Sequence, residues 1–313
     1  MDFEPFTGPS PTPRFQASPP GGILSKIFLN DKGVRGGWRL LIYAAFVAGL
    51  GFGGGIVLQQ FIRPTRGVFS LGYWFAYEVF CFTVVFGAAL IMAQIEGRSP
   101  DTYGLPLRGA FGKLFWQGCL IGLVEVSALI GLIAAFRGYS FGEVALHGKE
   151  LLRWGMFWAV LFIFVGLFEE FLFRGYTQYT LAESIGFWPA AAVFSCAFGA
   201  VHLGNPGEGW VGAGGVAAIG LIFAFALRRT GNLWLAVGWH ASFDFGETFL
   251  YSVPNSGIVF AGHLSNASLH GAKWLTGGTV GPEGSVFSFL IMGILALAIQ
   301  LLFPAKKTEP AQK

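Results

Sequence analysis

The chain has 313 residues, of which 54 % are hydrophobic and 12 % are charged, and its mean hydropathy is +0.60. A soluble domain carries roughly twice this charged fraction, and here the apolar residues form blocks of about 20, the length that a helix needs to cross a bilayer. This excludes an ordinary soluble domain and predicts an all-α fold, a polytopic membrane helix bundle of about eight transmembrane helices in contact with membrane lipid. The net charge of +3 does not indicate a nucleic-acid partner. The three cysteines are scattered through apolar segments, which argues against a disulfide framework or a Cys-rich zinc site.

The chain begins with a polar, proline-rich tail, residues 1–35, which has no apolar core of the kind found in signal peptides. We expect this tail to be disordered, with a short interfacial helix around Ile23 to Leu29. Eight apolar blocks follow, and we expect a transmembrane helix in each, at about 38–61, 69–95, 110–136, 151–182, 187–203, 210–228, 231–251 and 284–304.

The blocks and their connections divide the chain into regions. N-terminal transmembrane helices occupy 36–150, a core occupies 151–251, an extramembrane loop occupies 252–283, and the last helix with a basic tail occupies 284–313. The loop is long and polar, so we expect its two histidines, His263 and His270, to lie at the surface.

The distribution of basic residues predicts the orientation in the membrane. Eight spans place both termini on the same side. If that side is the cytoplasm, 14 of the 20 Lys and Arg residues fall in or next to the inner segments. The positive-inside rule therefore predicts cytoplasmic termini in a multi-pass protein, and we expect it in the cell (inner) membrane.

Charged groups inside the apolar blocks are the main indication of function, because each costs about 2.5–3.5 kcal/mol near the bilayer centre. Two carboxyls, Glu78 and Glu125, are isolated in the sequence. The other ionisable groups gather within about 80 residues of the core: Glu169, Glu170, Arg174, His202, His240, Asp244 and Glu247.

The first group of charges predicts an ion pair and leaves one carboxyl over. Glu170 and Arg174 are spaced i, i+4 on one helix face, so they can form a charge-assisted pair that serves structure as well as chemistry. Glu169 is rotated by about 100° from Glu170 and needs another partner. It lies 17 residues before Gly186 and His202 lies 16 after it, so in an antiparallel hairpin both sit roughly 24–25 Å from the turn. The spacing predicts a buried contact between Glu169 and His202.

The two histidine segments admit a structural and a functional interpretation. Phe194, Phe198 and His202 recur every four residues, a stripe typical of packing that would seat the imidazole against an apolar wall. His240 and Asp244 share a face at i, i+4. Either Asp244 merely orients His240, or both side chains face the cavity of Glu169 and His202. Two histidines and several carboxylates could bind zinc, although an HExxH helix is absent.

These side-chain types suit hydrolysis by an activated water. A carboxylate beside an imidazole in a dry pocket can hold and deprotonate water, and a second imidazole can donate to the oxyanion that forms when water attacks a carbonyl. No Ser or Cys in the cluster carries a nucleophile motif. Peptide-bond hydrolysis without a covalent intermediate is the interpretation that uses every group.

Three ordered motifs resemble one known family. The segments EEFLFRG, FGAVHLGN and TGNLW with the following HASFD carry Glu-Glu-x-x-x-Arg, Phe-x-x-x-His and His-x-x-x-Asp, a pattern similar to that of the CPBP intramembrane protease family. That family includes the type II CAAX prenyl endopeptidases and the bacterial Abi-type proteins linked to bacteriocin immunity. The resemblance covers about 80 residues and implies that residues 151–251 form a protease-like catalytic core.

The resemblance also implies a role for each residue. Glu169 would be the general base, His202 would help to position the attacking water, and Glu170 with Arg174 would form the supporting ion pair. His240 and Asp244 match the oxyanion-stabilising pair, but the prenyl proteases usually carry Asn where this chain has Asp244. A charged carboxylate would repel an oxyanion, so Asp244 must be protonated, orient His240 or help to bind a metal. No cofactor is favoured. If zinc is present, its ligands would be Glu169, His202, His240 and Asp244.

The leading hypothesis is therefore an intramembrane endopeptidase, glutamate- or metal-dependent, that acts on a membrane-associated or lipidated peptide or protein. A second is a non-enzymatic immunity or scaffold protein that retains the motifs. A third is a transporter with a proton path through Glu78, Glu125 and the cluster, although the sequence contains no internal repeat of the kind that transporters have.

Overall fold

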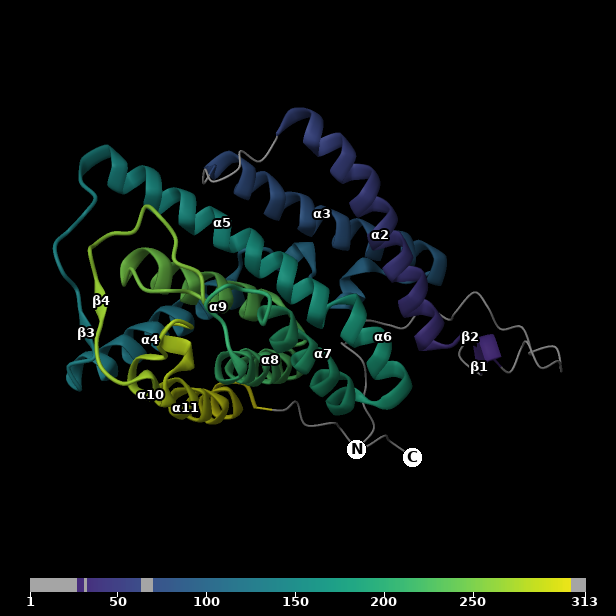
Figure 1. Cartoon of the computed structure of the whole chain (residues 1–313). Coiled ribbons are helices and arrows are strands. Elements are labelled where there is room, and N and C mark those ends of the chain that lie inside the picture. Colours follow the sequence, from purple (N-terminus) through teal and green to yellow (C-terminus); the bar gives the residue numbers. More distant parts are fainter. Residues whose placement is uncertain (1–26, 31–32, 63–69, 305–313) are drawn as a thin grey trace.

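A computed structural model describes residues 27–30, 33–62 and 70–304 and confirms the all-α fold (Figure 1). Most of the expected N-terminal tail and interfacial helix lies outside these residues. Two short antiparallel two-stranded sheets pair β1 (Leu29–Asn30) with β2 (Gly33–Val34) and β3 (Tyr139–Ser140) with β4 (Ser268–Leu269). The α-helices are α2 (Gly36–Phe61), α3 (Leu71–Glu96), α4 (Lys113–Ala135), α5 (Gly148–Arg174), α6 (Tyr176–Ile185), α7 (Phe187–His202), α8 (Trp210–Thr230), α9 (Trp234–Phe245), α10 (Lys273–Thr276) and α11 (Val286–Leu302).

The expected count of eight spans is not confirmed. Within the described residues, five apolar segments are long enough to cross a membrane: α2, α3, α4, the stretch Gly148–Ile185 that comprises α5 and α6, and α8. Helices α7 and α11 are apolar but shorter. Helix α9 has 12 residues, about 18 Å of helix, and nearly all of its side chains are buried against other helices. The apolar block at 231–251 is therefore an interior helix followed by a π-helical turn, Gly246–Leu250.

The expected single helix at 151–182 is broken at Gly175. The backbone there leaves the helical region, and a Cβ atom at this position would overlap the carbonyl oxygen of Phe171. The chain therefore changes direction between α5 and α6. A second turn at Gly186, whose φ of +89° favours glycine, then folds α7 back along α6. The hairpin that Gly186 closes is thus formed by α6 and α7, and Glu169 lies beyond the break.

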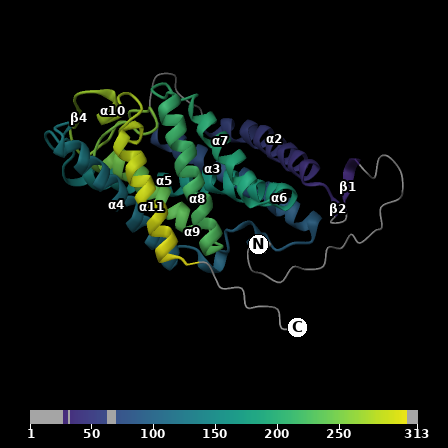
Figure 2. The same ribbon diagram turned by 90° about the horizontal axis from the view of Figure 1, so that it is seen from below.

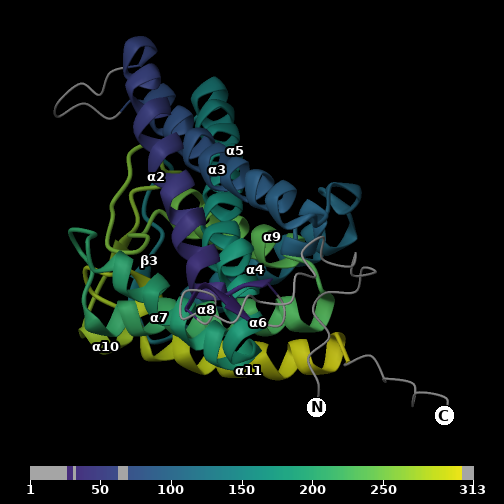
Figure 3. The same cartoon turned by 90° about the vertical axis from the view of Figure 1, so that its right-hand side faces the viewer.

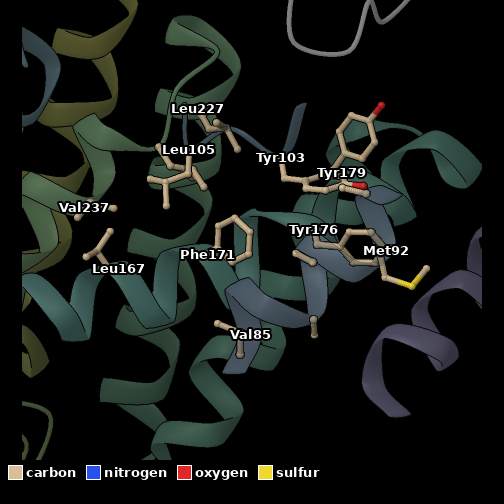
Figure 4. Close-up of a cluster of buried hydrophobic side chains, with 14 of the residues drawn as sticks. Val85, Met92, Tyr103, Leu105, Leu167, Phe171, Tyr176, Tyr179, Leu227 and Val237 are labelled. Carbon is tan, nitrogen blue, oxygen red and sulfur yellow. The ribbon is translucent and has the colours of Figure 1, made fainter. Parts of the chain in front are cut away.

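Helices pack around α9 from several sides. Helices α2, α3 and α5 run side by side, and α11 lies on the opposite side of the molecule (Figure 3). Helix α8 lies between α7 and α11 (Figure 2). The largest apolar cluster joins α3, α5 and α6, and the rings of Phe171, Tyr176 and Tyr179 lie within it (Figure 4).

Glycines allow α4 to approach α9 at backbone distance. A Cβ atom at Gly118 would overlap the carbonyl oxygen of Leu235, and one at Gly122 would overlap that of Trp239. Gly238 of α9 faces the backbone of α4 in the same way. Close approach through small residues is the usual way in which membrane helices pack, and here it fixes the helix that carries His240.

We expect Gly118→Ala to lower the stability of the folded protein by about 1–3 kcal/mol, because the added methyl group has no space between two backbones. Gly131→Ala on the same helix is the matched control, since nothing lies within 4 Å of its Cβ position. Thermal unfolding in lipid nanodiscs measures both. Equal midpoints for the two variants would contradict the proposed close packing.

A polar network that the sequence did not predict anchors α2. The guanidinium of Arg39 lies 2.6 Å from Glu96 Oε2 and 2.5 Å from Glu183 Oε2, and Arg98 contacts both carboxylates as well. The hydroxyl of Tyr176 donates to Glu96 Oε1 over 2.6 Å. These contacts join α2, α3 and α6. They matter because only 6 % of the 18-residue apolar stretch of α2 is buried inside the protein.

The segment 252–283, expected to be extramembrane, folds back onto the helices. β4 pairs with β3, the Nδ2 atom of Asn205 donates to the carbonyl of Ser256, and the backbone N–H of Gly207 donates to that of Gly257. His270 is exposed, and His263 is half-buried with its Nδ1 bonded to the Ser265 carbonyl. The segment thus covers part of the core, while its two histidines bond within the loop.

Candidate active site

The last turn of α5 presents two adjacent carboxyls in different surroundings. Glu170 and Arg174 are fully buried, and Arg174 Nη1 lies 3.2 Å from Glu170 Oε1. The guanidinium carbon of Arg174 also lies 4.2 Å from the ring centre of Phe198 on α7, a cation–π contact. Helix α8 makes room with Gly220, where a Cβ atom would overlap Arg174 Nη2. The side chain of Glu169, in contrast, retains 22 % of its exposure.

The imidazole of His240 is surrounded by three carboxyls. Its Nδ1 lies 3.0 Å from Glu170 Oε1, and its Nε2 lies 3.6 Å from Glu169 Oε2 and 3.5 Å from Asp244 Oδ2. Because Glu170 is paired with Arg174 as a carboxylate and can only accept, Nδ1 carries a proton. The other ring nitrogen, Nε2, faces the carboxyls of Glu169 and Asp244. The ring of His240 stacks on Phe223 of α8, with 5.8 Å between ring centres.

His202 is the last residue of α7, one turn after Phe198. Its Nδ1 donates to the Phe198 carbonyl oxygen over 2.8 Å, which leaves the lone pair on Nε2. The Phe198 ring is edge-on to both imidazoles, with ring centres 4.8 Å from His202 and 6.1 Å from His240. No hydrogen bond or ion pair joins Glu169 to His202 in the described part of the chain. The break at Gly175 explains this, because the expected equal depth assumed a continuous helix.

A pocket of about 60 Å³ opens beside the two histidines. Its polar lining comes from His202, His240, Asp244, Ser256, Glu125 and Glu283, and its apolar lining includes Phe198, Val216, Ile219, Phe223, Phe243 and Met292. Glu125 has no charged neighbour in the sequence. Its place within an apolar helix is the sequence signal that its side chain faces the interior. Glu283 lies in a polar loop, where a carboxyl is ordinary, so no sequence signal singled it out. Burial raises the pKa of Glu283 above its ordinary value.

Glu247 and Glu78 lie near the site without lining the pocket. Glu247, in the π-helical turn, is fully buried, and neither of its carboxyl oxygens has a hydrogen-bond partner among the described residues. Glu78 of α3 is buried close enough to Glu169 for their charges to repel. The sequence included Glu247 in the cluster but did not predict that Glu78 approaches Glu169.

The donor set expected for zinc is not gathered into a metal site. Across residues 27–30, 33–62 and 70–304, no group of three or more His, Cys, Asp or Glu side chains is arranged to hold a metal ion. Of the four ligands considered from the sequence, His240 approaches Glu169 and Asp244, whereas no hydrogen bond or ion pair among the described residues joins His202 to any of these three. The residues as placed do not fit a bound metal.

Comparison with known proteins gives one match. The model of a family described as "Rce1-like: Type II CAAX prenyl endopeptidase Rce1-like" matches residues 151–246, from the first turns of α5 to just past the end of α9. No curated protein and no solved structure matches the chain. The matched segment contains Glu169, His202, His240 and Asp244, so the resemblance drawn from the three motifs is confirmed. Residues 151–246 of this chain are therefore similar to the Rce1-like type II CAAX prenyl endopeptidases.

Proposed function

We propose that this multi-pass membrane protein is an intramembrane endopeptidase that hydrolyses a peptide bond with a water molecule activated by Glu169 and His202. The observation that carries the proposal is the position of His240 Nε2, between Glu169 at 3.6 Å and Asp244 at 3.5 Å, at the edge of a pocket that His202 also lines. The similarity of residues 151–246 to that family supports peptidase activity.

Glu169 is the general base in this proposal. Its neighbour Glu170 is fully buried, and one of its oxygens already accepts from Arg174 and His240. The partial exposure of Glu169 lets water reach its carboxylate. The lone pair on His202 Nε2 accepts the second hydrogen of that water and orients its oxygen toward the peptide carbonyl.

The reaction needs no covalent intermediate. The water oxygen attacks the carbonyl carbon while its proton moves to Glu169, and the carbonyl oxygen becomes an oxyanion that accepts from His240 Nε2–H. Glu169 then delivers the proton to the peptide nitrogen as the C–N bond breaks, which releases an amine and a carboxylic acid. Asp244 holds the imidazole in place, since it lies on the same face of α9 one turn away.

We expect Asp244→Asn to keep peptide hydrolysis within about tenfold of the parent, whereas Asp244→Ala lowers it by about 10²-fold or more. The side chain of Asn can still contact the His240 ring, which lies 3.5 Å from Asp244 in the parent, whereas Ala leaves the ring unsupported on that side. Steady-state kinetics on purified protein compares the two. Similar losses in both variants would instead indicate that the charge of Asp244 is required.

The substrate class follows from the setting. Five membrane-length apolar segments among the described residues support a site in or next to lipid, and the matching family is described as a type II CAAX prenyl endopeptidase. We propose a peptide at the membrane surface or a lipid-attached carboxyl-terminal segment as the substrate.

The test is hydrolysis of a quenched fluorescent peptide library by the protein in lipid nanodiscs, with and without a chelator, together with metal analysis. We expect cleavage that the chelator does not reduce. Stoichiometric zinc and cleavage lost to the chelator would replace this mechanism by the zinc-dependent one. No cleavage of any peptide would favour the immunity or scaffold hypothesis.

A further inference from the structure

The pocket beside His240 contains carboxyl groups that the proposed hydrolysis does not use. Glu125 reaches it from α4 and Glu283 from the turn before α11, and both are more than nine-tenths buried. Behind them, Glu247 lies close enough to Asp244, Glu125 and Glu283 for their charges to repel. The far side of the pocket is therefore acidic.

In the described part of the chain, no basic side chain forms an ion pair with Glu125, Glu247 or Glu283, and the nearby His240 contacts Glu169, Glu170 and Asp244 instead. Glu125 accepts from a neutral donor, Trp239 Nε1, over 2.5 Å. Oε1 of Glu283 and both oxygens of Glu247 are buried, and the two carboxyls lie close enough to interact with each other but have no basic partner among the described residues. Arg174, the buried guanidinium nearby, is paired with Glu170. Buried carboxylates without a partner are costly, so a ligand that brings positive charge would be stabilised here.

The pocket walls indicate what kind of cation fits. Aliphatic and aromatic side chains from α7, α8, α9 and α11 line it, among them Val216, Ile219 and Met292. The aliphatic part of a lysine or arginine side chain buries its methylene groups against such walls. Its charged end would then meet Glu125, Asp244 and Glu283. A bare metal ion would gain nothing from the apolar lining.

We propose that this pocket binds a basic side chain of the substrate, lysine or arginine, next to the peptide bond that is cut. The inference rests on the proposed endopeptidase function for the location of the bond, because the pocket shares His240 and His202 with the candidate active site. It assigns Glu125 and Glu283 to substrate selection.

Binding to a variant that lacks the proposed base tests this without any need for cleavage. The Glu169→Gln protein in lipid nanodiscs is titrated with two fluorescent alanine-based hexapeptides that contain one lysine or one norleucine, which has the same chain without the ammonium group. We expect the lysine peptide to bind at least about tenfold more tightly, the effect of one charge-assisted hydrogen bond. Adding Glu283→Gln or Glu125→Gln should remove most of that preference. Either amide keeps the shape of the side chain, and the amide oxygen that Glu125→Gln introduces can still accept from Trp239.

Glu143→Gln is the matched control, because it removes the same charge from an exposed side chain outside the pocket. Equal binding of the two peptides, or a preference that Glu283→Gln and Glu125→Gln both leave intact, would overturn the inference. If the parent cleaves library peptides but the Glu169→Gln protein binds the two hexapeptides equally well, the protease proposal stands and only the inference about this pocket is refuted. If the protein cleaves no peptide but binds the lysine peptide preferentially, and the pocket variants lose that preference, the pocket inference stands and the protease proposal is refuted.

Discussion

Glu169→Gln is expected to lower the rate of peptide hydrolysis by about 10²–10⁴-fold, the contribution of a positioned general base. The change keeps the size of the side chain and its ability to contact His240, but an amide cannot take a proton from water. Folding should be retained, because the Glu169 side chain is partly exposed and takes no part in the ion pair between Glu170 and Arg174. Hydrolysis of the best library peptide in lipid nanodiscs, with thermal unfolding in parallel, measures both effects.

The control for this variant lies on the same helix. Glu150→Gln also removes a carboxylate from α5, in the first turn, where its side chain is exposed and paired only with Arg153. We expect normal hydrolysis from it. A Glu169→Gln protein that is folded and as active as the Glu150→Gln protein would show that the base has been assigned to the wrong carboxyl.

Arg174→Ala should have the largest effect on folding. It removes the partner of a fully buried carboxylate, and breaking such a pair destabilises a protein by about 3–5 kcal/mol. It also removes the cation that lies over the Phe198 ring and so loosens the contact between α5 and α7. We expect a much lower yield of folded protein, seen by gel filtration in detergent and by the thermal midpoint of what remains.

A double replacement separates charge from packing. In Glu170→Gln/Arg174→Met, no charge is left unpaired, Met fills much of the space of Arg, and the Gln oxygen can still accept from His240 Nδ1. This variant should recover a large part of the lost stability. If Arg174→Ala alone folds with the yield and midpoint of the parent, the pair has no structural role.

The parts of the site that follow from local spacing could be predicted from the sequence. Residues four apart on a helix share a face, so the contact between Glu170 and Arg174 and the approach of Asp244 to His240 follow from the order of residues. The membrane setting and the all-α fold follow from the long apolar blocks in the same way.

The contacts between distant segments could not be predicted in this way. Spacing paired Glu169 with His202, but Gly175 breaks the helix and His240, from a helix about 70 residues further along the chain, takes the place beside Glu169. Whether α9 spans the membrane or lies inside the bundle depends on the glycines that let α4 approach it. The network of Arg39 with Glu96 and Glu183 joins three helices, and no single segment contains its pattern.

The most direct test of the central claim is mass spectrometry of the products formed in water enriched in ¹⁸O, with the parent protein and Glu169→Gln compared on the same peptide. If a water activated by Glu169 hydrolyses the peptide, the parent protein produces two fragments. In a single turnover, the new carboxyl terminus of one fragment carries one ¹⁸O atom. The Glu169→Gln protein should leave the peptide intact over the same time. Intact peptide with both proteins, or equal cleavage by both, would contradict the account.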